Sequence, residues 1–244
     1  MAKAITSKVK RKSPLTTVVT FQTTANCYNT MKVLLIGHGR SKTNYCLSLI
    51  SDYYKLENLG EIYKECVNRD SLLKITSDLK NKNDFVIKID ACLLSVFQQI
   101  GVSFNMLDLD IYDKIYTIRR ENISDTVASL KIAKHTNFWV YDEITPVPKH
   151  FDPVTIDPET DQYIFESVIC GYKQLNKIES YMDENSYTYT QLKYETVEQY
   201  ADKNWLGATS KVIESKYNYS KMITNYDSII DMYYSTWCSR WKLL

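Results

Sequence analysis

The segment KVLLIGHGRSKT, residues 32–43, decides the fold that this sequence predicts. Its first part, Val33 to Ile36, is a continuous apolar run, which is typical of a parallel strand buried on both faces. A turn with glycines at positions 37 and 39 follows the run. Apolar residues then recur at helical spacing, at Cys46, Leu49, Ile50, Tyr53 and Tyr54. The order strand, glycine-containing turn, helix is the first half of a βαβ unit.

Strands and helices continue to alternate along the rest of the chain. We predict strands over 85–90, 112–119 and 187–194. We predict helices over 69–80, after Asp90, after a cap at Asn122 or Ser124, over 160–184 and within 205–244. Residues 142–158 hold four of the five prolines and are predicted to form a loop. This alternation indicates an α/β fold of three layers around a mostly parallel central sheet.

Length and composition indicate one soluble globular domain. The chain has 244 residues, of which 44% are hydrophobic and 24% charged. We assign residues 31–244 to a single domain and residues 1–30, which contain five basic residues and no acidic one, to a flexible tail or an upstream extension. The net charge of +1 argues against a dedicated nucleic-acid binder, although it permits a local basic pocket.

Cysteines and histidines give no sign of a metal or redox centre. The six cysteines include no CxxC pair. We therefore expect reduced, buried thiols, with Cys46, Cys92 and Cys170 inside helices of a cytoplasmic protein. The three histidines lack the spacing of metal ligands, so no metal is expected. No apolar run reaches the length of a membrane span, so no membrane partner is expected either.

The turn at residues 37–44 has the composition of a phosphate-binding loop. It lies where a helix begins, and backbone N–H groups and the helix dipole favour an anion there. The dinucleotide fingerprint GxGxxG matches at Gly37 and Gly39, but Lys42 stands at its third glycine. The Walker A pattern fits at Lys42 and Thr43, and Asp90 would then anchor magnesium. That second pattern keeps an ATP-dependent phosphotransferase as an alternative function.

A third interpretation accounts for more of the chain. The loop GHGRSKTNY, residues 37–45, resembles the R-S-G-T-(T/S) loop of sulfotransferases that use 3′-phosphoadenosine-5′-phosphosulfate. The segment IYTIRRENISDTVASL, residues 115–130, is similar to the second signature of that family, a strand that ends in arginine followed by a helix that carries serine. The sequence LKYE, residues 192–195, looks like a later strand end of the same family. The resemblance covers residues 31 to about 200.

This resemblance implies a fold, a donor and a set of binding residues. The fold would be the P-loop-like sulfotransferase fold. The loop would grip the 5′-phosphosulfate, and Arg119 or Arg120 would hold the 3′-phosphate together with Ser129. The product would be adenosine 3′,5′-bisphosphate, no metal would be needed, and the acceptor would be a hydroxyl or amine of a small molecule, carbohydrate or peptide. The loop residues concerned are Gly37, Gly39, Arg40, Ser41, Lys42, Thr43 and Asn44.

The same resemblance implies roles in catalysis. Transfer of a sulfuryl group passes through a loose transition state, so cations and a base are the main requirements. Arg40 is similar to the family's loop cation beside the bridging oxygen. Lys88 and Asp90 resemble the Lys-Thr-His triplet of some members, with Asp90 at the position of the base. Glu61 is the other candidate base, because related bacterial members use a glutamate after the first helix.

Two departures from the family pattern set the limits of this hypothesis. Lys42 replaces the loop glycine; a positive φ at this position would cost about 1 kcal/mol, and the extra cation could contact the sulfuryl group. The spacing from Arg120 to Ser129 is nine residues, whereas eight is usual, and the sequence does not choose between Arg119 and Arg120. A degenerate nucleotide-fold module that binds a partner without turnover is a further alternative, which Lys42 favours. Acceptor identity and oligomeric state are not predicted.

Overall fold

A computed structural model describes residues 30–137, 152–210, 212 and 217–241 of the chain. The predicted tail at residues 1–30 lies outside the described residues except for Thr30. The part of the predicted loop from residue 142 to residue 151 also lies outside them. Five strands form one parallel sheet in the order β2-β3-β1-β4-β5. The strands are β1 Lys32–Gly37, β2 Glu57–Asn58, β3 Phe85–Asp90, β4 Lys114–Arg119 and β5 Thr190–Lys193.

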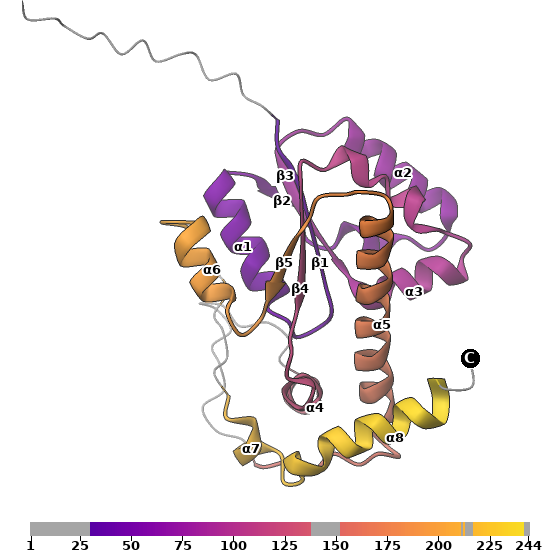
Figure 1. The fold of residues 1–244 in the computed structure, drawn as a ribbon, viewed down its shortest axis with the longest axis vertical. Coiled ribbons are helices and arrows are strands. Elements are labelled where there is room, and N and C mark those ends of the chain that lie inside the picture. The colour runs from indigo at the N-terminus through magenta and orange to yellow at the C-terminus, as the bar shows by residue number, and fades with distance from the viewer. Residues whose placement is uncertain (1–29, 138–151, 211, 213–216, 242–244) are drawn as a thin grey trace, which may run out of the picture.

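Helices cover both faces of this sheet, which confirms the three-layer α/β expectation. Figure 1 shows α1 and α6 on one face, α2, α3 and α5 on the other, and α4, α7 and α8 beyond the carboxyl ends of the strands. The bounds are α1 Thr43–Tyr54, α2 Arg69–Lys80, α3 Ala91–Gln99, α4 Ile123–Thr136, α5 Gln162–Glu184, α6 Val197–Asn204, α7 Tyr219–Met222 and α8 Ile229–Trp241.

The predicted elements lie close to the observed ones. Helix α2 and strand β3 have the predicted ends, and Asn122 caps α4, because its side chain accepts a hydrogen bond from the Asp125 N–H at 3.1 Å. Strand β5 is shorter than predicted, since the tyrosine-rich alternation from residue 187 pairs with β4 only from Thr190. Strand β2 was not predicted. Its two residues are exposed and carry no apolar pattern.

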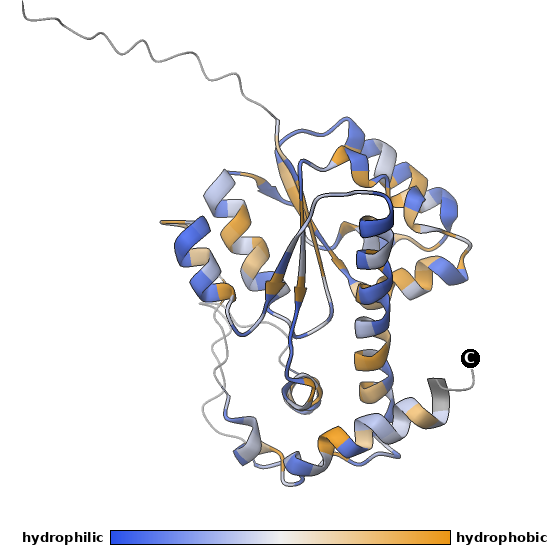
Figure 2. Cartoon of the chain, in the orientation of Figure 1, coloured by the Kyte–Doolittle hydropathy of each residue, from blue (hydrophilic) through white to orange (hydrophobic). Residues whose placement is uncertain are grey.

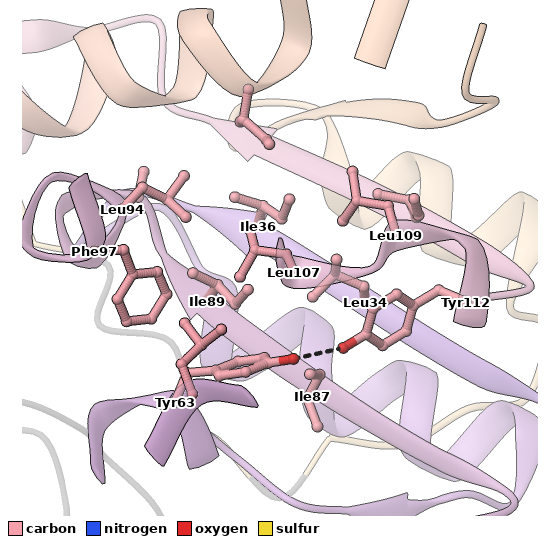
Figure 3. Close-up of a cluster of buried hydrophobic side chains, with 14 of the residues drawn as sticks. Leu34, Ile36, Tyr63, Ile87, Ile89, Leu94, Phe97, Leu107, Leu109 and Tyr112 are labelled. Carbon is pink, nitrogen blue, oxygen red and sulfur yellow. Dashed lines mark hydrogen bonds between the residues drawn. The ribbon is translucent and has the colours of Figure 1, made fainter. Parts of the chain in front are cut away.

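The core explains why the central strands read as continuous apolar runs. Figure 3 shows side chains of β1 and β3 packed against Leu94 and Phe97 of α3, with a hydrogen bond of 3.3 Å between the hydroxyls of Tyr63 and Tyr112. A second cluster joins the opposite face of the sheet to α1 and to Trp205. Figure 2 shows this pattern, with apolar residues along the central strands and mixed residues along the helices.

The described cysteines are free thiols at positions 46, 66, 92, 170 and 238. Cys46 is buried in α1, as expected. Cys92 and Cys170 are only half-buried, so the expectation of buried thiols does not hold for these two. Within the described ranges no single helix is long and apolar enough to cross a membrane; one bent pair, Ala91–Gln99 with Phe104–Ile111, reaches that length only in combination.

The strand order puts a crevice between β1 and β4. The chain leaves β1 towards β2 at one edge of the sheet and leaves β4 towards β5 at the other edge. Adjacent parallel strands whose connections diverge in this way open a ligand crevice beyond their carboxyl ends. The two segments singled out in the sequence, residues 37–44 and 119–129, follow these two strands.

Candidate functional site

The turn after β1 has the backbone of an anion-binding loop. Arg40 and Lys42 have φ values of 66° and 61°, while Ser41 between them is not in the left-handed region. Such alternation turns successive N–H groups into a concavity that favours anions. Lys42 is also the N-cap of α1, and its side chain makes no capping hydrogen bond. The first N–H groups of α1 lack intrahelical acceptors, and the positive φ considered for Lys42 is confirmed.

Close packing fixes the position of this turn. A Cβ atom at Gly37 would lie 2.6 Å from side-chain atoms of Ile118 and Thr43, so only glycine lets the turn approach β4. The Ser41 hydroxyl donates a hydrogen bond of 2.5 Å to the carbonyl oxygen of His38. Ser41 is fully buried. Gly37 and Ser41 therefore shape the loop from inside rather than line a cavity.

His38 connects the turn after β1 to the turn after β4. Its Nδ1 lies 2.9 Å from the Gly39 carbonyl oxygen, and its Nε2 accepts a hydrogen bond of 3.2 Å from the Arg120 N–H. The Gly39 carbonyl can only accept a hydrogen bond and the Arg120 N–H can only donate one. The ring must therefore be neutral and protonated at Nδ1. Burial lowers the pKa of His38 to about 4, and the charges of Arg120 and Arg119 act in the same direction.

A direct side-chain contact joins the two signature segments. The Nε of Arg40 donates a hydrogen bond of 2.9 Å to the hydroxyl oxygen of Ser129 in α4. Ser129 is 3% exposed. Residues 89 positions apart in the chain therefore meet at the crevice between β1 and β4.

The two neighbouring arginines at the end of β4 face opposite environments. Arg119 pairs with Glu179 and donates to the Asn176 side chain at 3.2 Å, both in α5. The guanidinium of Arg120 lies 4.0 Å from the ring centre of Tyr194 and pairs with Asp125 at 3.0 Å. Side chains alternate along a strand, so neighbours at a strand end diverge. Arg120 is the arginine that reaches a cavity.

The first cavity beside the turn, which we call the loop cavity, has a volume of about 750 Å³. It brings together all four residues proposed for catalysis. Candidates that line it are Gly39, Arg40, Thr43, Asn44, Glu61, Lys88 and Asp90. The rest of its wall comes from Gly60, Lys64, Leu130, Lys134, Tyr163, Ile164 and Ser167.

Lys88 is the buried cation of the loop cavity. Its side chain pairs with Glu61 at 2.5 Å and contacts the amide oxygen of Asn44 in the first turn of α1. Burial lowers the pKa of Lys88 to about 8, and the negative charge of Asp90 partly opposes this shift. Lys88 is therefore mostly charged at pH 7 and loses its proton in mildly alkaline solution.

The two acids of the loop cavity have different surroundings. Glu61 pairs with both Lys88 and Lys64. Asp90 caps α3, because its Oδ1 accepts a hydrogen bond of 2.9 Å from the Cys92 N–H. Its Oδ2 faces Gly39, since a Cβ atom there would lie 3.6 Å from it. Asp90 combines a structural role with an oxygen directed at the turn.

The second cavity, which we call the tyrosine cavity, has a volume of about 650 Å³. Its lining includes two of the candidate residues, Lys42 and Arg120, together with four tyrosines. Its full lining is Lys42, Arg120, Asn122, Asp125, Tyr194, Glu198, Tyr217, Asn218, Tyr219, Ser220 and Tyr226. Of the residues in the Walker A interpretation, Thr43 and Asp90 line the loop cavity together, whereas Lys42 lines the tyrosine cavity.

Several residues of the tyrosine cavity were not predicted. Tyr194 and Glu195 belong to the LKYE segment, which the sequence flagged without a role. Glu195 Oε1 accepts hydrogen bonds from the N–H groups of Glu121 at 3.0 Å and Asn122 at 3.3 Å, and so fixes the turn after Arg120. Tyr219 and Tyr226 come from a C-terminal region whose tyrosines have no sequence period, so no local signal identified them.

Comparisons with known proteins leave the family open. No protein-family model matches the chain, and no curated protein matches it either. Among the residues that the structure describes, no group of three or more His, Cys, Asp or Glu side chains is placed to hold a metal ion.

Proposed function

We propose that this protein is a sulfotransferase of the P-loop-like fold, which moves a sulfuryl group from 3′-phosphoadenosine-5′-phosphosulfate to a hydroxyl or amine. The observation that carries the proposal is the hydrogen bond of 2.9 Å between Arg40 Nε and Ser129 Oγ. It joins the two segments that resemble the family's signatures, and each of the two cavities has a buried cation in its lining, Lys88 in one and Arg120 in the other. A donor with anionic groups at both ends needs two such cavities.

The residues of the loop cavity suit the transfer step. The donor supplies an activated sulfuryl group. Arg40 and Lys88 supply positive charge for the oxygens that gain negative charge as the bond between sulfur and the bridging oxygen breaks. The acceptor's oxygen or nitrogen forms the new bond to sulfur and loses a proton. We assign that proton to Asp90, because Glu61 is already paired with two lysines.

The residues of the tyrosine cavity suit the other end of the donor. The Arg120 guanidinium is 3% exposed and its Nε has no hydrogen-bond partner. A buried N–H without a partner is costly, and a phosphate oxygen would satisfy it. The cavity is also lined by tyrosine rings, and a purine base can stack on a ring face that the two cations leave open. Acceptor identity follows from neither cavity alone.

Isothermal titration calorimetry tests this proposal. The full chain is titrated with adenosine 3′,5′-bisphosphate and, separately, with Mg-ATP. We expect binding of the bisphosphate at tens of micromolar protein or below, and weaker binding of Mg-ATP. No bisphosphate binding would contradict the proposal, and tighter Mg-ATP binding that Asp90→Asn abolishes would favour the phosphotransferase alternative.

Variants of the joining contact sharpen the result. Arg40→Ala and Ser129→Ala should each weaken bisphosphate binding. Ser124→Ala is the matched control, because Ser124 lies in the first turn of the same helix, whereas the hydrogen bond from Arg40 goes to Ser129. Equal affinities in Ser129→Ala and Ser124→Ala would remove Ser129 from the site.

A further inference from the structure

The side chain of Lys42 does not follow the rest of its loop. Arg40, Thr43 and Asn44 line the loop cavity, whereas Lys42 lines the tyrosine cavity. Its ammonium lies 4.3 Å from the ring centre of Tyr194 and 3.3 Å from Glu198 Oε1. The side chain is 8% exposed, so its charge is held inside the molecule.

Lys42 and Arg120 converge on one aromatic ring. The guanidinium of Arg120 lies 4.0 Å from the centre of the same Tyr194 ring. Both cations also line the tyrosine cavity, and like charges in a partly buried place repel each other. An anion bound in that cavity would relieve the repulsion and would find donors on both.

The acids of the tyrosine cavity differ in how firmly they are held. Asp125 pairs with Arg120 and accepts a hydrogen bond of 2.5 Å from the Tyr226 hydroxyl. Glu198, in the first turn of α6, has a side chain that is 47% exposed. An entering anion would therefore displace Glu198 from Lys42 and leave Asp125 in place.

We propose that Lys42 binds the 3′-phosphate of the nucleotide together with Arg120 and so makes the site selective for nucleotides that carry this phosphate. The inference rests on the proposed function and replaces the expectation that Lys42 contacts the sulfuryl group. Lys42 is then a specificity-determining residue.

Calorimetry with two nucleotides tests this role. Adenosine 3′,5′-bisphosphate and adenosine 5′-monophosphate differ only in the 3′-phosphate. For Lys42→Met we expect bisphosphate affinity to fall about tenfold, the loss of one charge-assisted contact, and monophosphate affinity to change less than about twofold. Lys42→Arg should keep most of the bisphosphate affinity. Glu198→Gln should raise it about threefold, because it removes the competing carboxylate.

Lys55→Met is the matched control. Lys55 is the left-handed residue at the other end of α1, with φ 56°, and it pairs with Asp52 away from both cavities. Its substitution should change neither affinity, and circular dichroism should show that all variants are folded.

The possible failures are distinguishable. If the unmodified chain binds no bisphosphate, the proposed function falls and this inference with it. If that chain binds but Lys42→Met binds equally well, only the role of Lys42 is wrong. Equal losses for both nucleotides would mean that Lys42 contacts the 5′ end, which also overturns the inference.

Discussion

The two cavities beside residues 38–44 hold their cations in different ways. In the loop cavity, Lys88 pairs with a carboxylate and contacts an amide, and a second acid, Asp90, shares the space. In the tyrosine cavity, Arg120 also pairs with a carboxylate, Asp125, but it lies against aromatic rings and keeps an unsatisfied N–H. The first arrangement suits chemistry that needs both a cation and a base. The second suits binding of a base and a phosphate without chemistry.

The largest effect should come from removing Arg120, one of the two cations of the tyrosine cavity. For Arg120→Gln we expect the affinity for adenosine 3′,5′-bisphosphate to fall by about two to three orders of magnitude, since a buried charge-assisted contact is lost. Arg119→Gln is the matched control and should change the affinity less than about threefold, because Arg119 faces α5. Calorimetry measures both.

Equal losses of bisphosphate affinity in Arg120→Gln and Arg119→Gln would contradict the distinction between the two arginines. The end of β4 would then bind the nucleotide through general positive charge, and the distinction between its two sides would have no functional meaning. Thermal unfolding of both variants checks that each remains folded, because Arg120 is buried and Arg119 also has an ion pair to lose.

The buried ring of His38, which connects the turn after β1 to the turn after β4, should make stability depend on pH. His38 has a pKa of about 4 in the folded protein against an ordinary value of 6.5. The unfolded chain therefore takes up a proton first as the pH falls, and the free energy of unfolding should drop by about 3 kcal/mol between pH 6.5 and pH 4. Above pH 6.5 this contribution is fully present.

Urea unfolding at several pH values measures that effect. His38→Gln keeps a donor and an acceptor without a titrating group, so its stability should fall about 3 kcal/mol less over the same range. His135→Gln, at an exposed position in α4, should behave like the unmodified chain. Parallel curves for the unmodified chain and His38→Gln would show that His38 does not cause the pH dependence.

The loop cavity should show its own pH dependence in binding. Lys88 has a pKa of about 8, so it loses its charge as the pH rises past that value. We expect bisphosphate affinity to fall about fivefold between pH 7 and pH 9. Lys88→Met should bind more weakly at pH 7 and lose this dependence. A variant that still shows the full fall would assign the dependence to another group.

The smallest effect concerns the backbone of α1. Lys55→Gly should raise the free energy of unfolding by about 1 kcal/mol, because glycine adopts a positive φ without strain. Lys42→Gly should raise the free energy of unfolding by a similar amount but should weaken bisphosphate binding. Lys55→Gly should leave bisphosphate binding unchanged. Urea unfolding and calorimetry separate the two results. A Lys42→Gly protein that is stabilised and binds unchanged would count against the role of its side chain.

The sequence predicted the fold well where patterns are local. The apolar run of β1, the helical spacing of α2 and the cap at Asn122 each depend on neighbouring residues, and each was predicted. Strand β2 escaped because its pairing with β3 is set by the tertiary fold rather than by its own two polar residues.

Many of the candidate residues lie together as predicted, but the tyrosines around Arg120 and the division of the candidates between two cavities were not predicted. Residues at the carboxyl ends of parallel strands must gather, so Arg40, Lys88 and Asp90 could be expected together. The separation of Lys42 from its loop neighbours depends on where Tyr194 and Glu198 lie, and the choice between Arg119 and Arg120 depends on where α5 and Tyr194 lie. Both are tertiary facts with no local signature.

A crystal structure with adenosine 3′,5′-bisphosphate tests the central claim most directly. We expect the 3′-phosphate within hydrogen-bond distance of the Arg120 guanidinium and the 5′-phosphate at the start of α1 beside Arg40. A nucleotide that lies with both phosphates in one cavity, or that binds away from the crevice between β1 and β4, would contradict the account.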